Sequence, residues 1–274
     1  MDYVQNPADG IRIAYRVEGS GPALVMVHGT ALSQAIWRGF GYVRELATDF
    51  TTVTLDLRGH GRSGKPHERA AYRAEALVSD ILAVLDEAGI DRAHYLGYSL
   101  GGRVGFSLAA THPERMLSFV SAAGSPRIAP DSFDRVFFPG CIEALETGGM
   151  AGFIDGWERS GAVLDASTRA AFTANDALAL AAYMRESSAD PGVADSLLAA
   201  ITVPTLLMVG SDDRGTRRAN EAALALLPNA SLRVLDGVNH GGTLRHADAR
   251  PTIREFFASA NAGDSGTRRV IRPL

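Results

Sequence analysis

The chain has 274 residues, of which 46% are hydrophobic, so it is long enough for one large domain or two small ones with a substantial core. Its 27 lysine and arginine residues nearly balance 31 aspartate and glutamate residues, and the formal net charge of -4 argues against nucleic acid or an anionic membrane as a partner. The single cysteine, Cys141, excludes an internal disulfide and a zinc cluster built on cysteines.

The N-terminal segment, residues 1–10, lacks the basic start and the apolar run of a secretory signal peptide. The longest apolar runs, including residues 23–27 and 205–209, are far shorter than the roughly 20 residues that cross a bilayer. We therefore expect a cytoplasmic protein that has no membrane partner.

Short apolar or β-branched runs recur along the chain and predict strands. These runs are Ile11–Val17, Ala23–His28, Thr51–Asp56, Ala93–Gly97, Leu117–Ala122, Thr205–Gly210 and Ser231–Leu235. Helical stretches lie between them; one is Arg73–Ala88, which places apolar residues at helical spacing and ends at Gly89. The alternation predicts an α/β fold, with a mostly parallel, twisted sheet and helices on both faces.

The alternation breaks at residues 127–200, where the pattern is helical and indicates no strand. We interpret this stretch as a helical cap inserted into a core of residues 1–126 and 201–260, with residues 261–274 as a loose tail. It contains seven aromatic residues, Phe133, Phe137, Phe138, Phe153, Trp157, Phe172 and Tyr183. We expect Trp157, Phe137 and Phe138 to bind substrate; packing within the core of the insertion is the alternative for each.

The predicted strand at residues 93–97 leads into Gly97-Tyr98-Ser99-Leu100-Gly101 and then into a helical stretch at residues 103–110. In such a strand-to-helix turn the serine has a strained backbone, and the two flanking glycines avoid clashes with neighbouring chain. The turn exposes the Ser99 hydroxyl and places the N–H of Leu100 at a helix N-terminus, where it can donate to an oxyanion. A glycine-rich turn with an incidental serine is the alternative.

With this motif in its context, the chain resembles the α/β-hydrolase superfamily over nearly its whole length. Residues 25–30 resemble the His-Gly-x loop of that family, which implies that the N–H of Thr30 is the second oxyanion donor. Gly29 lets the backbone approach a substrate oxygen closely. Residues 56–63 resemble the Asp-x-Arg-Gly-x-Gly-x-Ser turn of many members, and we interpret both this turn and His28 as structural.

A serine hydroxyl needs an adjacent base, and the base needs an orienting group. His240 lies in the loop after the last predicted strand, where the superfamily carries its base, and His246 is the reserve candidate. The strand at residues 205–209 is followed by two adjacent aspartates; the family pattern Gly-x-x-Asp selects Asp213 as the acid, and Asp212 is the alternative. The aspartate that is not the acid would be solvated or would cap the next helix.

The resemblance implies a serine hydrolase in which Ser99 attacks a carboxylic ester, His240 transfers the proton, Asp213 orients the imidazole, and Leu100 and Thr30 bind the oxyanion. It requires no metal and no organic cofactor. The aromatic insertion favours a small, largely apolar substrate as partner, and either a monomer or a homodimer fits the sequence.

Three other functions stay open. A lactone or carbon–carbon bond hydrolase uses the same triad, and a perhydrolase or cofactor-free oxygenase relative keeps the His–Asp pair. From a different class, the same fold serves as a non-catalytic small-molecule receptor. A haloalkane dehalogenase or epoxide hydrolase is disfavoured, because those relatives carry aspartate where this chain has Ser99. The residues after Asp213 and His240 differ from the common family pattern, so the resemblance does not specify a substrate.

Overall fold

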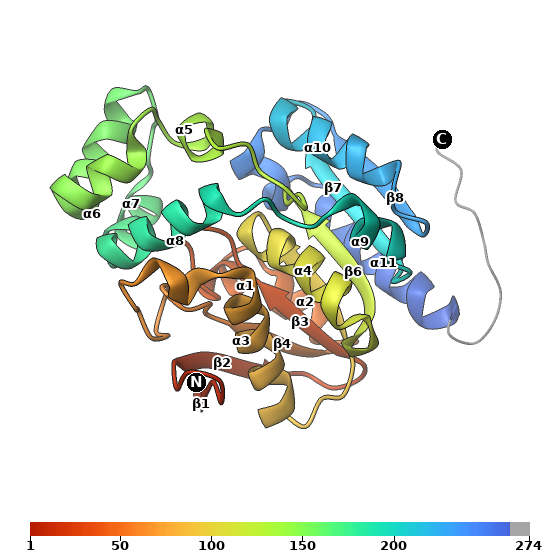
Figure 1. Ribbon diagram of the computed structural model, residues 1–274. Coiled ribbons are helices and arrows are strands. Elements are labelled where there is room, and N and C mark those ends of the chain that lie inside the picture. The colour runs from red at the N-terminus through yellow and green to blue at the C-terminus, as the bar shows by residue number, and fades with distance from the viewer. Residues whose placement is uncertain (264–274) are drawn as a thin grey trace.

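The structure is a computed structural model that describes residues 1–263 of the chain. Within this range a twisted eight-stranded sheet runs through the molecule, with helices on both of its faces (Figure 1). The strands are β1 (Asp2–Gln5), β2 (Arg12–Glu18), β3 (Ala23–Val27), β4 (Thr51–Leu55), β5 (Ala93–Tyr98), β6 (Met116–Ala122), β7 (Thr205–Gly210) and β8 (Ala230–Leu235). Their spatial order is β1-β2-β4-β3-β5-β6-β7-β8.

Only the pairs at one edge of this sheet, β1 with β2 and β2 with β4, are antiparallel. Every other neighbouring pair is parallel, from β4 and β3 across to β7 and β8. The predicted α/β fold with a mostly parallel sheet is therefore confirmed.

The helices outside residues 127–200 are α1 (Ala35–Gly39), α2 (Tyr42–Leu46), α3 (Ala74–Glu87), α4 (Leu100–Thr111), α10 (Arg214–Leu224) and α11 (Ala249–Gly263). Short 3-10 turns occur at η1 (Arg69–Tyr72), η2 (Pro113–Arg115) and η3 (His240–Arg245).

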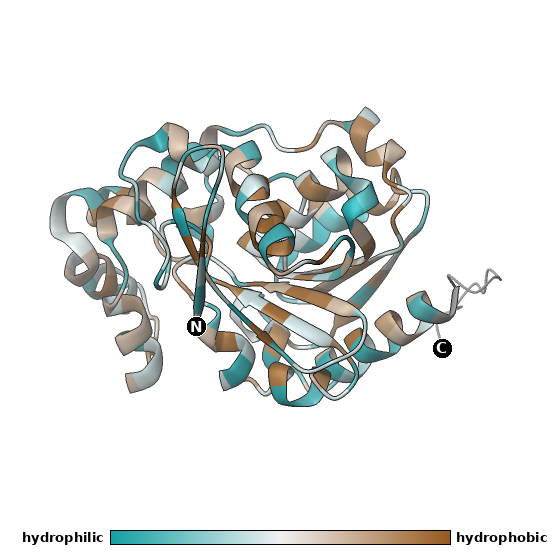
Figure 2. Cartoon of the chain, turned by 90° about the horizontal axis from the view of Figure 1, so that it is seen from below, coloured by the Kyte–Doolittle hydropathy of each residue, from teal (hydrophilic) through white to brown (hydrophobic). Residues whose placement is uncertain are grey.

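The central strands bury side chains on both faces of the sheet. In β3, Val25 and Val27 join the core that includes α3 and α4, whereas Leu24 and Met26 join the core that includes α2 and α11. Alternation of side chains along a strand therefore turns one continuous apolar run into two buried faces. In Figure 2, coloured by hydropathy, the strands carry brown and pale segments and the surrounding helices mix brown with teal.

The strand β1 was not predicted. Three of its four residues are exposed and its sequence, Asp-Tyr-Val-Gln, has no apolar alternation. This segment is a strand because its backbone pairs with β2 at the edge of the sheet. Backbone pairing does not require apolar side chains, so the four residues show no hydrophobic pattern in the sequence.

The segment between β6 and β7 contains helices only, as expected for residues 127–200. They are α5 (Ser132–Val136), α6 (Cys141–Arg159), α7 (Ala166–Thr173), α8 (Ala177–Ala189) and α9 (Asp195–Ala200). The helix α6 is kinked at Gly149, where φ is 62° and ψ is -160°. In Figure 1, α5 to α8 form a group on one side of the sheet, and the chain after α8 leads to α9 beside α4. We call residues 127–200 the helical insertion.

The C-terminal helix extends further than the sequence indicated. It ends at Gly263, and the side-chain oxygen of Asn261 accepts a hydrogen bond from Nε2 of His94 on β5, at 2.9 Å. The predicted start of a loose tail at residue 261 was therefore wrong for residues 261–263. The rest of that predicted tail, residues 264–274, lies outside the described residues. No helix within residues 1–263 combines the length and the apolar character needed to span a membrane.

Candidate active site

Ser99 lies at the sharp turn between β5 and α4. Its backbone angles are φ 51° and ψ -109°, a conformation that a residue with a side chain rarely adopts. A Cβ at Gly97 would lie 2.3 Å from the carbonyl carbon of Gly101, and one at Gly101 would lie 2.1 Å from the carbonyl oxygen of Val27. The strained serine and the need for both glycines, which the motif predicted, are thus confirmed.

The structure brings the three residues predicted as a triad into one hydrogen-bonded chain. Nε2 of His240 is 2.9 Å from Oγ of Ser99, and Nδ1 of His240 is 2.6 Å from Oδ2 of Asp213. Because an ionised carboxylate can only accept, Nδ1 carries the proton and Nε2 accepts from the Ser99 hydroxyl. The side chains of His240 and Asp213 are 21% and 11% exposed, so water reaches the imidazole but hardly reaches the carboxylate.

Asp213 both contacts the imidazole of His240 and caps the next helix. Its Oδ2 contacts His240, while its Oδ1 accepts a hydrogen bond from the N–H of Thr216 at 3.4 Å and so caps α10. Burial raises the pKa of Asp213, but the hydrogen bond and charge of His240, together with Thr216, outweigh it, so the pKa lies below its usual value. Asp212 is exposed and contacts Ser211. Of the two roles left open for the aspartate that is not the acid, Asp212 therefore has the solvated one, and the helix cap is Asp213 itself.

The reserve histidine, His246, follows η3 and its Nδ1 accepts a hydrogen bond from the backbone N–H of Asp248 at 3.2 Å. It therefore belongs to the turn before α11, and His240 is the histidine that the structure places at Ser99.

Tyr98, immediately before the serine, was missed as a site residue. Its hydroxyl donates to the backbone carbonyl of His240 at 3.0 Å, and the two rings lie 6.0 Å apart. Burial, and then the charge of Asp213, raise the pKa of Tyr98, so the hydroxyl keeps its proton. The last residue of β5 thus holds the loop that carries the imidazole.

The predicted oxyanion donors belong to two segments that pack against each other. A Cβ at Gly29 would lie 3.2 Å from Cβ of Ser99, and the N–H of Gly101 donates to the carbonyl of His28 at 3.1 Å. Leu100 is the first residue of α4, where a backbone N–H has no partner inside the helix. Thr30 directly follows Gly29, so its peptide group borders the serine; its oxyanion role stays a prediction.

His28 and the turn at residues 56–63 support the backbone beneath the site. Nδ1 of His28 donates to the carbonyl of Gly29 at 2.8 Å, and Nε2 accepts from the N–H of Leu57 at 3.1 Å. Burial lowers the pKa of His28 to about 4, so the ring is neutral and can accept. The carboxylate of Asp56 accepts from the backbone N–H groups of Gln34 and Arg62 at 2.7 and 3.0 Å. These contacts agree with the structural interpretation of both segments.

The three aromatic residues expected to bind substrate pack mainly against other aromatic rings of the insertion. The ring of Phe137 lies 5.1 Å from that of Trp157 and 5.1 Å from that of Phe153, and Phe138 lies 5.4 Å from Phe153. These contacts correspond to the alternative that the sequence left open, packing within the insertion. Contact with substrate stays a prediction for Trp157, Phe137 and Phe138.

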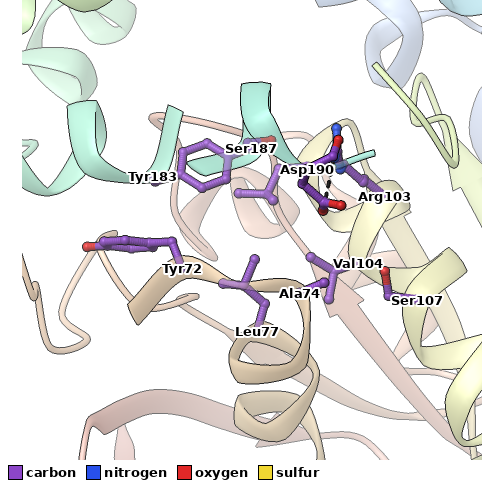
Figure 3. Close-up of a pocket in the computed structure, with 10 residues that line it drawn as sticks. Tyr72, Ala74, Leu77, Arg103, Val104, Ser107, Tyr183, Ser187 and Asp190 are labelled. Carbon is purple, nitrogen blue, oxygen red and sulfur yellow. Dashed lines mark hydrogen bonds and ion pairs between the residues drawn. The ribbon is translucent and has the colours of Figure 1, made fainter. Parts of the chain in front are cut away.

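A small cavity lies next to the site, between α3, α4 and α8 (Figure 3). Leu100 and Tyr183 line it, and the ion pair between Arg103 and Asp190, 3.0 Å between Nη2 and Oδ2, crosses it from α4 to the end of α8. Its volume of about 10 Å³ suffices for about one water molecule, which is too little for an organic substrate. Among residues 1–263, no group of three or more His, Cys, Asp or Glu side chains is arranged to hold a metal ion.

Comparison with known proteins agrees with this fold. The family profile described as alpha/beta hydrolase fold matches residues 22–147. An uncharacterised protein of Mycobacterium tuberculosis is 41% identical over 120 residues, which cover 42% of this chain and 33% of that protein. The match thus spans about a third of the length of that relative. A pimeloyl-acyl-carrier-protein methyl ester esterase of Aeromonas hydrophila is 39% identical over 108 residues, which cover 39% of this chain and 40% of the esterase.

Structural similarity extends over nearly the whole chain. The crystal structure of the enol-lactonase from Burkholderia xenovorans superimposes with a TM-score of 0.79 at 27% identity and covers 94% of this chain and 100% of the lactonase. The family profile and the structural similarity together support assignment of the chain to the α/β-hydrolase superfamily, a family of hydrolytic enzymes.

Proposed function

We propose that the protein is a serine hydrolase that cleaves a carboxylic ester of a small, largely apolar substrate through an acyl-enzyme. The observation that carries this proposal is the continuous hydrogen-bonded chain from Oγ of Ser99 through His240 to Asp213. A serine hydroxyl alone is a weak nucleophile at neutral pH, and this chain supplies the adjacent base and the group that orients the base.

In the proposed reaction, Oγ of Ser99 attacks the ester carbonyl carbon while Nε2 of His240 takes the hydroxyl proton. The negative charge moves to the carbonyl oxygen, which accepts hydrogen bonds from the N–H groups of Leu100 and Thr30. Collapse of this intermediate breaks the bond to the alcohol oxygen, which takes the proton from His240 and leaves as the alcohol. Water then attacks the acyl group, with the same proton transfers, and releases the acid and the free serine.

Asp213 stays ionised through this cycle, since its pKa lies below the usual value. Its charge stabilises the imidazolium that forms when His240 holds the proton, and its Oδ2 fixes the Nδ1–H tautomer. The hydrogen bond from Tyr98 to the carbonyl of His240 holds the base at the distance that both transfers need.

An esterase and a lactonase among the similar proteins support the proposal of an ester substrate. The esterase of Aeromonas hydrophila shares 39% identity with a segment of this chain, and the segment is too short to transfer its substrate. The similarity to the enol-lactonase favours a second candidate, a lactone, because a lactone is a cyclic ester that the same groups can open. The proposal of an apolar substrate rests on the aromatic composition of the insertion.

A panel of p-nitrophenyl esters, lactones and thioesters, assayed with the wild-type protein and with Ser99→Ala, tests the proposed function. We expect multiple turnovers of at least one ester or lactone by the wild type and a loss of at least 10⁴-fold in Ser99→Ala. Uptake of one ¹⁸O atom from labelled water into the acid product distinguishes hydrolysis from perhydrolysis or oxygenation. Tight retention of a ligand without turnover would instead favour the receptor alternative, and unimpaired cleavage by Ser99→Ala would refute the mechanism.

A further inference from the structure

Two side chains of the helical insertion bind the loop that carries the predicted oxyanion donor. The hydroxyl of Thr30 donates to the hydroxyl of Tyr183 on α8 at 3.2 Å, and Nδ2 of Asn175 donates to the carbonyl of Ala31 at 2.9 Å. The two contacts fall on successive residues, and their partners lie 153 and 144 positions further along the chain. We call residues 28–32 the oxyanion loop.

The oxyanion loop has a conformation that needs external support. Ala31 has a φ of 59°, in the left-handed region that residues with a Cβ disfavour. Such a residue keeps this conformation only when its surroundings hold it there. Within the loop, the turn bond from the N–H of Leu32 to the carbonyl of Gly29, at 3.2 Å, supplies part of that support. The bond from Asn175 to the carbonyl of Ala31 supplies another part from the insertion.

Both partners in the insertion are themselves held in place. The ring of Tyr183, which is 2% exposed, makes edge contacts with the rings of His60, Tyr72 and Phe133 at 5.8 to 6.1 Å. The amide of Asn175 also donates to the carbonyls of Ala171 and Phe172, at 3.1 and 3.0 Å, so it caps the end of α7 while it reaches the loop. A buried ring and a helix cap have few alternative positions, so both tethers are rigid.

These contacts adjoin the peptide group that carries the predicted oxyanion donor. The N–H of Thr30 belongs to the peptide between Gly29 and Thr30, next to Ser99. The tether to Tyr183 fixes the side chain of Thr30, and the tether to Asn175 fixes the carbonyl that follows Ala31. Without them, Ala31 can relax toward a negative φ, and the peptide that carries the N–H turns away from the developing oxyanion.

We propose that Tyr183 and Asn175 are positioning residues that hold the oxyanion loop in its catalytic shape, so that the oxyanion hole is complete only while the helical insertion is docked. This inference rests on the proposed function, since it assigns the Thr30 N–H to the oxyanion. Neither side chain needs to touch the substrate. The insertion then contributes to the chemical step itself, in addition to any part in substrate binding.

The test is steady-state hydrolysis of p-nitrophenyl butyrate by Tyr183→Phe and Asn175→Ala, with phenylboronic acid as a tetrahedral mimic. Complete loss of one oxyanion donor lowers kcat by about 10²- to 10³-fold, so misplacing a donor that is still present should lower kcat by about tenfold. We expect that decrease in both variants, with KM changed less than about twofold and the affinity for phenylboronic acid lowered by the same factor as kcat. A role in substrate binding or in folding alone would not produce that combination.

Two sets of controls isolate the Thr30–Tyr183 hydrogen bond. Thr30→Val keeps the shape of the side chain but removes its hydroxyl, so its kcat should fall to the level of Tyr183→Phe. Because Thr30→Val and Tyr183→Phe remove the same bond, the double variant should fall no further than either single variant. Tyr72→Phe is the matched control: Tyr72 is equally buried beside α8, but its hydroxyl donates to the carbonyl of Pro66, and kcat should stay within twofold.

The outcomes separate this inference from the proposed function. If a fluorophosphonate labels the wild-type protein at Ser99 but Tyr183→Phe and Asn175→Ala keep kcat within twofold, the inference is wrong and the proposed function stands. A rise in KM alone in these variants also overturns the inference, since it would assign them to substrate binding. If the wild-type protein is not labelled at Ser99, the proposed function fails and the inference fails with it.

Discussion

Replacing Asp213 and Asp212 separately by asparagine distinguishes the catalytic acid from its neighbour. Oδ2 of Asp213 lies 2.6 Å from Nδ1 of His240, whereas Asp212 is exposed and contacts only the hydroxyl of Ser211 among the described side-chain hydrogen bonds. With charge centres about 4 Å apart and an effective dielectric constant of about 20, the carboxylate stabilises the imidazolium by about 4 kcal/mol, which corresponds to about 10³ in rate.

An asparagine at position 213 also donates where the carboxylate accepts, which favours the wrong imidazole tautomer and raises the expected loss to between about 10³ and 10⁴ in kcat. KM should change little, because Asp213 acts through His240 rather than on the substrate. Folding stability should also change little, since asparagine caps helices about as well as aspartate. The assay is p-nitrophenyl butyrate hydrolysis together with thermal unfolding of each variant.

Asp212→Asn is the matched control and should keep kcat within twofold of the wild type. If Asp213→Asn retains more than a tenth of the wild-type kcat, or if Asp212→Asn loses as much, then the assignment of the acid from the 2.6 Å contact is incorrect.

Other predictions concern the backbone and the buried charges around the site. Gly101→Ala places a Cβ about 2.1 Å from the carbonyl oxygen of Val27, so we expect at least 10²-fold lower activity and a destabilisation of about 3 kcal/mol in urea unfolding. Wild-type activity would contradict the claim that the turn at Ser99 has no room for a side chain at position 101. The buried carboxylate of Asp80 accepts hydrogen bonds from Arg58 at 2.6 and 2.7 Å. Arg58→Met removes this counter-charge and should lower the free energy of unfolding by about 3 to 5 kcal/mol. The double variant Arg58→Met/Asp80→Leu should recover part of that loss. Burial lowers the pKa of His28 to about 4, and burial followed by electrostatic interaction with His28 lowers the pKa of His60 to about 3. Below pH 6.5 these two histidines therefore bind more protons in the unfolded chain than in the folded chain. Between pH 7 and pH 5 the free energy of unfolding should therefore fall by about 2 kcal/mol for each of these two histidines, and His60→Gln should remove about half of the combined fall. A free energy of unfolding in urea that does not change with pH over this range would argue against both buried neutral rings.

The sequence predicts the parallel part of the sheet well, for a physical reason. Strands such as β3 and β7 are buried on both faces, so they appear as short continuous apolar runs, which is the pattern typical of strands in a parallel sheet. The edge strand β1 has no such pattern, because pairing of its backbone with β2 stabilises it and only Val4 among its side chains is partly buried.

The resemblance to the α/β-hydrolase superfamily selected the candidate triad, and the sheet explains why those three positions meet. Ser99, Asp213 and His240 come after β5, β7 and β8, and the carboxyl ends of parallel strands meet. The sequence could not show that one aspartate both caps α10 and holds the imidazole. Those two contacts use different oxygens of one side chain, and spacing along the chain does not distinguish them.

The tethers from the insertion were beyond sequence reasoning. Tyr183 appeared among seven aromatic residues of the insertion, and nothing in its local pattern separates the ring that reaches Thr30 from the rings that pack at Phe153. Asn175 follows a short helix, where an amide is an ordinary cap. Contacts across 144 and 153 positions depend on how the insertion docks, and only the folded chain specifies that docking.

Covalent trapping by a fluorophosphonate, followed by mass spectrometry of tryptic peptides, tests the central claim most directly. Trypsin should release Ser99 in the peptide of residues 93–103. We predict a single stoichiometric adduct on that peptide in the wild-type protein, parallel loss of ester turnover, and no adduct in Ser99→Ala or, over the same time, in His240→Ala. Turnover of an ester by wild-type protein that carries no adduct at Ser99 would contradict the account.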